Sequence, residues 1–222
     1  MSAPESFHPR WWTRAEPLWT RALRRNRTVA MFWWDGCQVD INGTRPQSCS
    51  PYGGYSTKID RQMEQKIQET VVAFKRDALD LAMFYYEGPD AEGHRNGPDS
   101  EGIESAVGKV DHYLWNLQMG LEREGLSDQF KNPAKTLPGN HGPPPGIHGY
   151  DPMMPDMWGI FFARGPAVLR GSAGPSMIRM VDVYNVLCYM LGMDPAANSG
   201  SWNDVKTFLE RNYDTHLYDR IV

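Results

Sequence analysis

A regular alternation between short apolar runs and long amphipathic stretches is the feature that most constrains the fold. Residues 28–34 form one apolar run and residues 79–86 form another. Each precedes a stretch, residues 59–75 and 101–124, in which apolar side chains recur every three or four positions. This periodicity predicts a buried strand followed by an amphipathic helix, twice over. That order implies right-handed crossovers, and hence an α/β fold with a largely parallel sheet flanked by helices.

A Pro-rich stretch interrupts this pattern. Residues 127–155 contain seven prolines and few apolar residues. So long a loop is unusual inside a compact domain, and it predicts either a functional loop or a place where a segment has been left out. Further elements are predicted on both sides of it, as helices over residues 16–24, 181–191 and 202–211 and a strand over residues 158–163. We treat residues 1–222 as a single domain.

Composition excludes several classes of protein. The 222 residues carry a formal net charge of −4, which gives no reason to expect nucleic acid as a partner. No stretch approaches the roughly 18–20 apolar residues that a membrane span needs. The first twenty residues lack the continuous apolar segment of a secretory signal peptide. We therefore expect no membrane span and no signal peptide in this chain.

Asp90 and His94 are the strongest candidates for chemistry. They lie in the sequence Glu-Gly-Pro-Asp-Ala-Glu-Gly-His, which we interpret as a Gly/Pro-rich loop at the carboxyl end of a parallel strand. A carboxylate combined with an imidazole suits zinc. His148 could supply a third ligand and leave a fourth position for water or substrate. The alternative is that the Asp-x-x-x-His spacing arose by chance and that His148 is an inert, exposed histidine.

Two further patterns favour an extracellular protein. Cys37 and Cys49 flank a short polar loop, an arrangement that resembles a disulfide-closed loop in an oxidising compartment. Asn26 and Asn42 each begin an N-glycosylation sequon. The alternatives are two ordinary thiols and two chance sequons. Cys188 lies in an apolar run and is predicted to be a small buried residue.

Tyr85 and Tyr86 end the second apolar run, just before the Asp90 segment. An aromatic face at that place could stack against a cation or a base. The alternative is that both are ordinary strand residues, one facing inward and the other outward.

Taken in order, these motifs resemble the ectonucleotide pyrophosphatase/phosphodiesterase family. The resemblance implies a partial alkaline-phosphatase-like core and an extracellular or cell-surface enzyme with two zinc ions. A Thr or Ser nucleophile in that family attacks phosphorus and forms a covalent intermediate. One zinc is held by an Asp, a His four residues later and a more distant His, which match Asp90, His94 and His148. The segments that carry the resemblance are residues 15–19, 32–37, 79–98, 148–151 and 181–188.

Within this family the choline-specific glycerophosphodiesterase type is favoured over the alkaline sphingomyelinase type. The reasons are residues 198–202 and the pair Cys37 and Cys49 with Arg45-Pro46 between them. A tyrosine just before the metal aspartate packs against the trimethylammonium group in that type, and Tyr85 is the matching position. The implied substrate is a small choline phosphodiester such as glycerophosphocholine, which is hydrolysed to phosphocholine. Assembly as a homodimer is left open.

The chain departs from the family pattern in two ways. The first half of the family's domain, with a metal-binding aspartate and the nucleophile, is absent. A Ser-Asp-His-Gly-Met segment with ligands for the second zinc is also absent, since residues 125–130 run straight into the Pro-rich stretch. The missing block would lie near residues 130–147. We therefore expect one complete zinc site, no nucleophile and negligible phosphodiesterase activity.

Several functional interpretations follow from this. The chain is either a fragment of a choline-type phosphodiesterase or a non-catalytic binding domain that keeps one zinc. A nucleotide pyrophosphatase-type or sphingomyelinase-type member is the alternative within the family. An unrelated α/β protein with inert histidines is the alternative outside it, and the order of the motifs argues against that.

Overall fold

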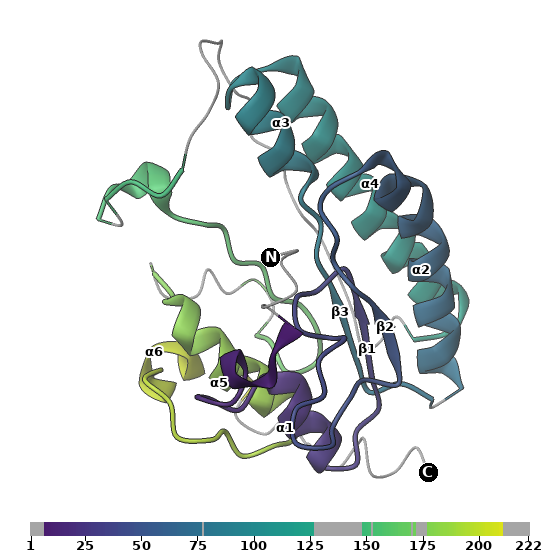
Figure 1. Ribbon diagram of the computed structural model, residues 1–222, viewed down its shortest axis with the longest axis vertical. Helices are drawn as coiled ribbons and strands as arrows, with labels where there is room; N and C mark the ends of the chain where they lie inside the picture. Colours follow the sequence, from purple (N-terminus) through teal and green to yellow (C-terminus); the bar gives the residue numbers. More distant parts are fainter. Residues whose placement is uncertain are drawn as a thin grey trace.

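The computed structural model describes residues 7–76, 78–126, 148–151, 153–169, 171 and 177–210. Residues 127–147 lie outside the described part, and so does the block that we predict to be missing near residues 130–147. Short 3₁₀ helices occur at Pro9–Trp11, Pro155–Met157 and Lys206–Phe208. The longer elements, labelled in Figure 1, are α1 (Leu18–Arg24), β1 (Val29–Phe32), β2 (Ser48–Ser50), α2 (Thr57–Lys75), β3 (Leu81–Phe84), α3 (Gly88–Asn96), α4 (Glu101–Arg123), α5 (Met180–Met190) and α6 (Trp202–Val205).

The sheet has three strands in the order β2-β1-β3, and both pairings are parallel. Met31 of the central strand pairs with Cys49 on one side and with Met83 on the other. The α/β class with a parallel sheet flanked by helices is therefore confirmed. Because the strands are parallel, the chain leaves β1 and β3 at the same edge of the sheet.

Alternate residues of β1 enter two different hydrophobic cores. Val29 and Met31 pack with α1 and α5, whereas Ala30 and Phe32 pack with α2. Successive side chains of a strand point to opposite faces, so four consecutive buried residues require a covered sheet on both sides. Figure 1 shows this layering, with α1 and α5 on one side of the sheet and α2 and α4 on the other.

The amphipathic helices follow their predicted bounds closely. Helix α2 buries Ile59, Met63, Ile67 and Val71, which recur at helical spacing and form the stripe that the sequence predicts. Helix α4 begins at an N-cap, because the Ser100 hydroxyl accepts a hydrogen bond from the backbone N–H of Ile103 at 3.3 Å. Gly120 of α4 lets the two helices approach closely, since a β-carbon there would lie 3.0 Å from Val71.

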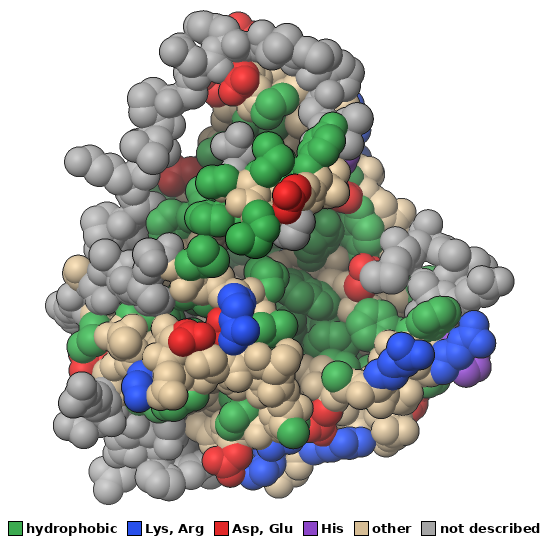
Figure 2. Space-filling model, turned by 90° about the vertical axis from the view of Figure 1, so that its left-hand side faces the viewer, with side chains coloured by type: hydrophobic (Ala, Val, Ile, Leu, Met, Phe, Trp, Pro, Cys, Tyr) green, Lys and Arg blue, Asp and Glu red, His purple; other side chains and the backbone are tan. Residues whose placement is uncertain are grey.

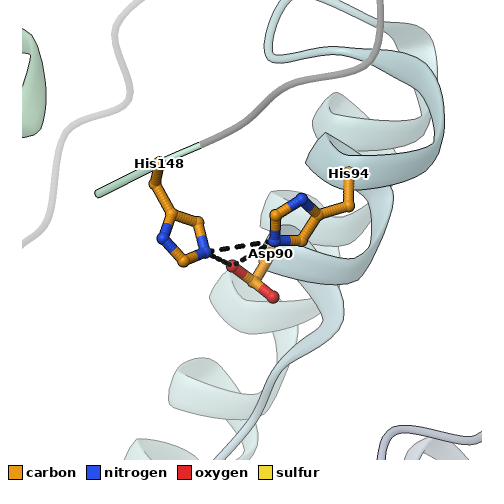
Figure 3. Close-up of side chains that lie close together, drawn as sticks. All are labelled: Asp90, His94 and His148. Atoms are coloured by element: carbon orange, nitrogen blue, oxygen red, sulfur yellow. Dashed lines mark hydrogen bonds and ion pairs between the residues drawn. The ribbon is translucent and has the colours of Figure 1, made fainter. Parts of the chain in front are cut away.

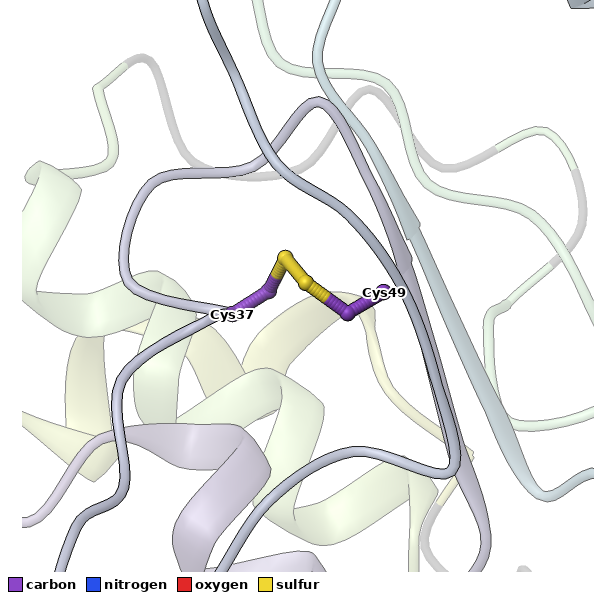
Figure 4. The surroundings of a disulfide bond; sticks show 2 residues. All are labelled: Cys37 and Cys49. Atoms are coloured by element: carbon purple, nitrogen blue, oxygen red, sulfur yellow. A yellow bond between two sulfur atoms is a disulfide. The ribbon is translucent and has the colours of Figure 1, made fainter. Parts of the chain in front are cut away.

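A disulfide joins Cys37 and Cys49, with Cα atoms 5.7 Å apart (Figure 4). Cys37 is buried in the core shared with α1 and α5, and Cys49 is the middle residue of β2. The bond therefore fastens the edge strand β2 to the core, and the predicted disulfide is present. Cys188 is a buried free thiol, as predicted, and burial raises its pKa.

Three local predictions were wrong. The Asp90 segment is the helix α3 rather than a loop. Residues 158–163 form no strand, and Ile160 and Phe162 are 82% and 77% exposed. The last predicted helix is shorter, because α6 ends at Val205 and a single 3₁₀ turn follows it. The strand β2 was not predicted at all, since its sequence Ser-Cys-Ser carries no apolar signal.

Apolar side chains are gathered on one face of the molecule. Figure 2 shows them around a hollow on the face that lies at the left of Figure 1. Contiguous apolar surface of this kind is typical of interaction faces and ligand grooves. No helix in the described ranges is long and apolar enough to cross a membrane. The most exposed large apolar residues of the described chain include Met153, Ile160, Phe162 and Met180.

Candidate metal centre

Residues 85–87 connect β3 to α3, and the helix forms despite its glycines and proline. Pro89 stands in the first turn, where a backbone N–H has no partner within the helix, so the missing donor costs little. The helix ends at Gly97, whose φ of 88° lies in the region that favours glycine. Asp90 and His94 are four residues apart and therefore lie on the same face of this helix.

Three side chains from two separate segments converge at this helix. Figure 3 shows Asp90 and His94 on α3, with His148 reaching them from a segment 54 residues after His94. The Asp90 Oδ1 atom is 2.8 Å from His148 Nε2 and 3.5 Å from His94 Nε2. The two Nε2 atoms are 3.1 Å apart. One oxygen and two nitrogens thus face a common point.

These distances fit a tetrahedral metal site. Zinc binds nitrogen and oxygen at about 2.0–2.1 Å, so two ligands of one tetrahedron lie about 3.3 Å apart. The observed separations of 2.8, 3.1 and 3.5 Å bracket that value. Three protein ligands leave a fourth position open, as in catalytic rather than structural zinc sites. The structure therefore brings together the three residues that the sequence nominates as ligands.

The site opens to solvent. The side chains of Asp90, His94 and His148 are 38%, 44% and 69% exposed. A small molecule could therefore reach these three side chains from solvent.

Tyr85 lies beside the site and is partly exposed, with 40% of its surface accessible. Two other aromatic rings meet it edge-on, Trp34 at 6.4 Å and Tyr52 at 5.3 Å between ring centroids. Burial raises the pKa of the Tyr85 hydroxyl, and the negative charges of Asp90 and Asp35 raise it further. The ring therefore stands in an aromatic and electronegative environment at the carboxyl edge of the sheet.

Trp34 and Tyr52 were not predicted as part of this site. Trp33 follows β1 directly and has a φ of 56°, a conformation that is rare for a bulky residue and turns the chain before Trp34. Tyr52 donates a hydrogen bond to Glu87, which is the N-cap of α3. A tryptophan at the end of a buried strand was a usable signal for Trp34, whereas no local pattern identifies Tyr52.

A family model described as type I phosphodiesterase/nucleotide pyrophosphatase matches residues 1–131. The mouse protein named bis(5′-adenosyl)-triphosphatase enpp4 is 22% identical over 303 aligned positions, which cover 96% of this chain and 66% of the relative. Mouse ectonucleotide pyrophosphatase/phosphodiesterase family member 3 is 30% identical over 128 residues, or 57% of this chain and 14% of that protein.

Solved structures of a third relative also match. Murine ectonucleotide pyrophosphatase/phosphodiesterase 5, in an inactive form bound to AMP, is 30% identical with a TM-score of 0.46 over 54% of this chain and 31% of that one. The human counterpart is 26% identical, with a TM-score of 0.46 and the same coverage.

The chain thus spans 66% or less of the length of these curated relatives. The family model covers 131 of its 222 residues, which is more than half, and it includes the whole of α3 with two of the three proposed ligands. On these grounds the chain belongs to the type I phosphodiesterase/nucleotide pyrophosphatase family.

Proposed function

We propose that this chain holds one zinc ion on Asp90, His94 and His148. We further propose that it belongs to a phosphodiesterase whose substrate is a small choline phosphodiester such as glycerophosphocholine. The observation that carries the proposal is the convergence of the three donor atoms, all within 4.8 Å of one another. When bound, zinc would act as a Lewis acid on a phosphoryl oxygen or lower the pKa of a bound water.

The chain's own residues would orient the substrate. Asp90 and His94 are fixed relative to each other by one turn of α3, and His148 closes the third side. The Asp90 carboxylate acts electrostatically on the Tyr85 hydroxyl, so the ring stands near the ligands, where it could face the cation of a substrate whose phosphoryl group lies at the open position. The carboxylates of Asp35 and Asp90 near that ring favour a positive rather than a negative group.

We expect the purified chain to show no phosphodiesterase activity. Two-metal chemistry needs both cations, and neither a nucleophile motif nor a second ligand set is found in the sequence. The alignment with mouse enpp4 extends over 303 positions, at least 81 more than the 222 residues of this chain, which supports a chain shorter than the family's domain. The family match ends at residue 131, inside the Pro-rich stretch, which supports a missing block at that place.

The measurement is release of phosphocholine from glycerophosphocholine by the zinc-loaded chain, followed by ³¹P NMR. An active glycerophosphodiesterase serves as the positive control, and the chelator-treated chain serves as the blank. Release at the level of the blank is the expected result. Zinc-dependent release that disappears in His94→Ala would contradict the predicted loss of activity.

Choline recognition predicts a specific role for the Tyr85 ring. We expect Tyr85→Ala to weaken binding of phosphocholine to the zinc-loaded chain about 10-fold, which lies between the roughly 0.5–1 kcal/mol of an exposed cation–π contact and the roughly 2 kcal/mol of a desolvated one. Tyr85→Phe keeps the ring and should bind as the unchanged chain does. Isothermal titration with phosphocholine, repeated on the zinc-free chain, makes the measurement. Equal affinity in all three proteins would remove Tyr85 from the choline site.

A nucleotide substrate is the second candidate. One of the relatives, mouse enpp4, is named a bis(5′-adenosyl)-triphosphatase, and this supports a nucleotide substrate. The rings of Trp34, Tyr52 and Tyr85 also offer a surface on which a base could stack. The same titration with AMP separates the two proposals, because a nucleotide site would bind AMP more tightly than phosphocholine.

An extracellular or cell-surface location is part of the proposal. The disulfide between Cys37 and Cys49 supports an oxidising compartment. Asn26 and Asn42, the two proposed glycosylation sites, are both exposed on the surface in the left-handed backbone region that Asn tolerates.

A further inference from the structure

We propose that Asp60 is a positioning residue for the metal site, acting through two tyrosines that brace the back of helix α3. This role concerns the same zinc site, and the identity of the ion rests on the proposed function. Asp60 lies in the first turn of α2 and touches none of the three ligands. Its influence must therefore pass through the side chains that it holds.

The Asp60 carboxylate collects donors from three parts of the chain. Lys109 of α4 donates to Oδ2 at 2.6 Å, and Tyr86 donates to Oδ1 at 2.9 Å. Tyr55, just before α2, donates at 3.2 Å. The carboxylate thus joins the start of α2, the connection after β3 and the middle of α4.

The charge of Asp60 is stabilised in this position. Burial by itself would raise its pKa, but the hydrogen bonds from Lys109, Tyr86 and Tyr55 outweigh burial and hold the pKa below its ordinary value. Burial, together with the hydrogen bonds to Tyr55 and Asp60, raises the pKa of Tyr86 far above its ordinary value. The Tyr86 hydroxyl therefore keeps its proton and remains a donor to Asp60.

Both tyrosines contact helix α3. The ring and hydroxyl of Tyr86 fold over Gly88, the first residue of the helix, so closely that a β-carbon at Gly88 has no room. The ring of Tyr55 lies under the guanidinium of Arg95, in the last turn, at 5.9 Å from its centroid. The two contacts therefore brace both ends of one short helix.

These contacts lie on the face of α3 opposite to the metal ligands. At 3.6 residues per turn, Gly88 and Arg95 are separated by only about 20° around the helix axis. Asp90 and His94 lie about 200° and 240° from Gly88 on the same helical wheel. Contacts on the Gly88 face therefore fix the orientation of helix α3, and with it the positions of Asp90 and His94, although they do not touch these two ligands.

Loss of this bracing should be measurable as weaker metal binding. Asp60→Asn removes the charge that holds Lys109 and leaves one oxygen to serve Tyr86 and Tyr55. Partners that orient metal ligands directly are worth 10–100-fold in metal affinity, and Asp60 acts one contact further away, so we expect a loss of about 5-fold. Tyr86→Phe keeps the ring over Gly88 and removes only the hydroxyl, so its loss should be smaller.

The experiment uses the full chain and compares these variants with Glu69→Gln. Glu69 is also a carboxylate of α2 that accepts from a lysine, Lys66 at 2.7 Å, yet its partners all lie on α2. Zinc affinity is measured by competition with a chromophoric chelator. The visible spectrum of bound Co²⁺, which accepts the same ligands, reports the geometry of the site. Unfolding in urea gives the stability of each variant.

Hydrogen exchange on the metal-free chain supplies a readout that needs no ion. We expect Asp60→Asn to speed exchange of the α3 amides, such as those of Ala91 and Gly97, while those of α5 stay protected. Wild-type zinc affinity, Co²⁺ spectrum and α3 exchange in both Asp60→Asn and Tyr86→Phe would overturn the proposal. Absence of zinc binding in the unchanged chain, with faster α3 exchange in Asp60→Asn, would overturn the zinc site and leave the bracing role standing.

Discussion

Replacing His94 with alanine is expected to abolish tight zinc binding. The unchanged chain should hold about one zinc ion per molecule after dialysis against a weak chelator, and His94→Ala close to none. Removing a direct ligand from a three-residue site should cost at least the 10–100-fold seen when merely a ligand's outer partner is removed. Metal content is measured by mass spectrometry of the dialysed protein, and affinity by competition with a chromophoric chelator.

His112→Ala is the matched control. His112 is an exposed histidine on α4 that pairs with Glu64 at 3.0 Å and has no contact with the three ligands. Its variant should retain the full zinc content. Equal zinc content in His94→Ala and in the unchanged chain would show that the ion, if present, lies elsewhere. A loss in the His112 variant as large as in the His94 variant would point to surface histidines acting without a defined site.

Replacing Asp182 with asparagine is expected to lower the free energy of unfolding by about 3 kcal/mol at pH 7. Asp182 is 0% exposed at the start of α5, and both of its oxygens accept hydrogen bonds. Oδ1 accepts from Arg179 Nη2 and from the backbone N–H of Ser201, while Oδ2 accepts from the Arg179 backbone and its Nε. Whichever way its amide is turned, an asparagine would place its NH₂ group against N–H donors that need an acceptor.

The pH dependence of this effect has a definite sign. The pKa of Asp182 lies below its ordinary value, and the hydrogen bonds from the Arg179 side chain are the largest cause. A carboxylate with a lowered pKa contributes stability above its unfolded pKa of about 3.9, and that contribution is lost as the pH falls through the folded value. The difference between the two proteins should therefore be constant from pH 5 to 7 and shrink below about pH 4.

Asp204→Asn provides the control for this prediction. Asp204 also faces Arg179, at 3.7 Å, but its side chain is 52% exposed. Exposed ion pairs contribute about 0–1 kcal/mol, so this variant should unfold nearly as the unchanged chain does. Urea titrations at several pH values measure both variants. A loss in Asp182→Asn no larger than in Asp204→Asn would mean that the buried carboxylate adds little to stability.

The sequence predicts the framework of the fold well because that framework depends on periodicity. The stripe of α2 and the apolar run of β1 are strong, uninterrupted patterns, and both are confirmed. Parallel order follows from strand–helix alternation alone. These features depend on which side chains are buried, and the spacing of apolar residues indicates that directly.

Elements whose stability comes from other sources were missed. Strand β2 contains Ser48, Cys49 and Ser50, and it is held by pairing with β1 and by the disulfide rather than by apolar side chains. Helix α3 contains glycines and a proline that normally interrupt helices, and it forms against α4 and the tyrosine rings. The opposite error occurred at residues 158–163, where an apolar run has no partner strand in the described chain.

The candidate site could be predicted only in part. Asp90 and His94 were recognisable because a short spacing links them. His148 was a weaker candidate by itself, and the resemblance of its segment to a known family strengthened it. Tyr52, which contacts Tyr85 from 33 positions away, leaves no trace in the sequence. The same holds for Asp60, whose partners Tyr86 and Lys109 meet it only after α2, β3 and α4 have packed. Contacts of that kind are properties of the folded chain.

An ion shared between α3 and His148 would close a loop of 54 residues without a covalent bond. Zinc binding and folding would then be thermodynamically linked. Free zinc at 100 times its dissociation constant would raise the free energy of unfolding by about 2.7 kcal/mol. The stability of the folded chain would accordingly depend on the concentration of free zinc around it. In a compartment poor in zinc, the folded chain would lack this added stability.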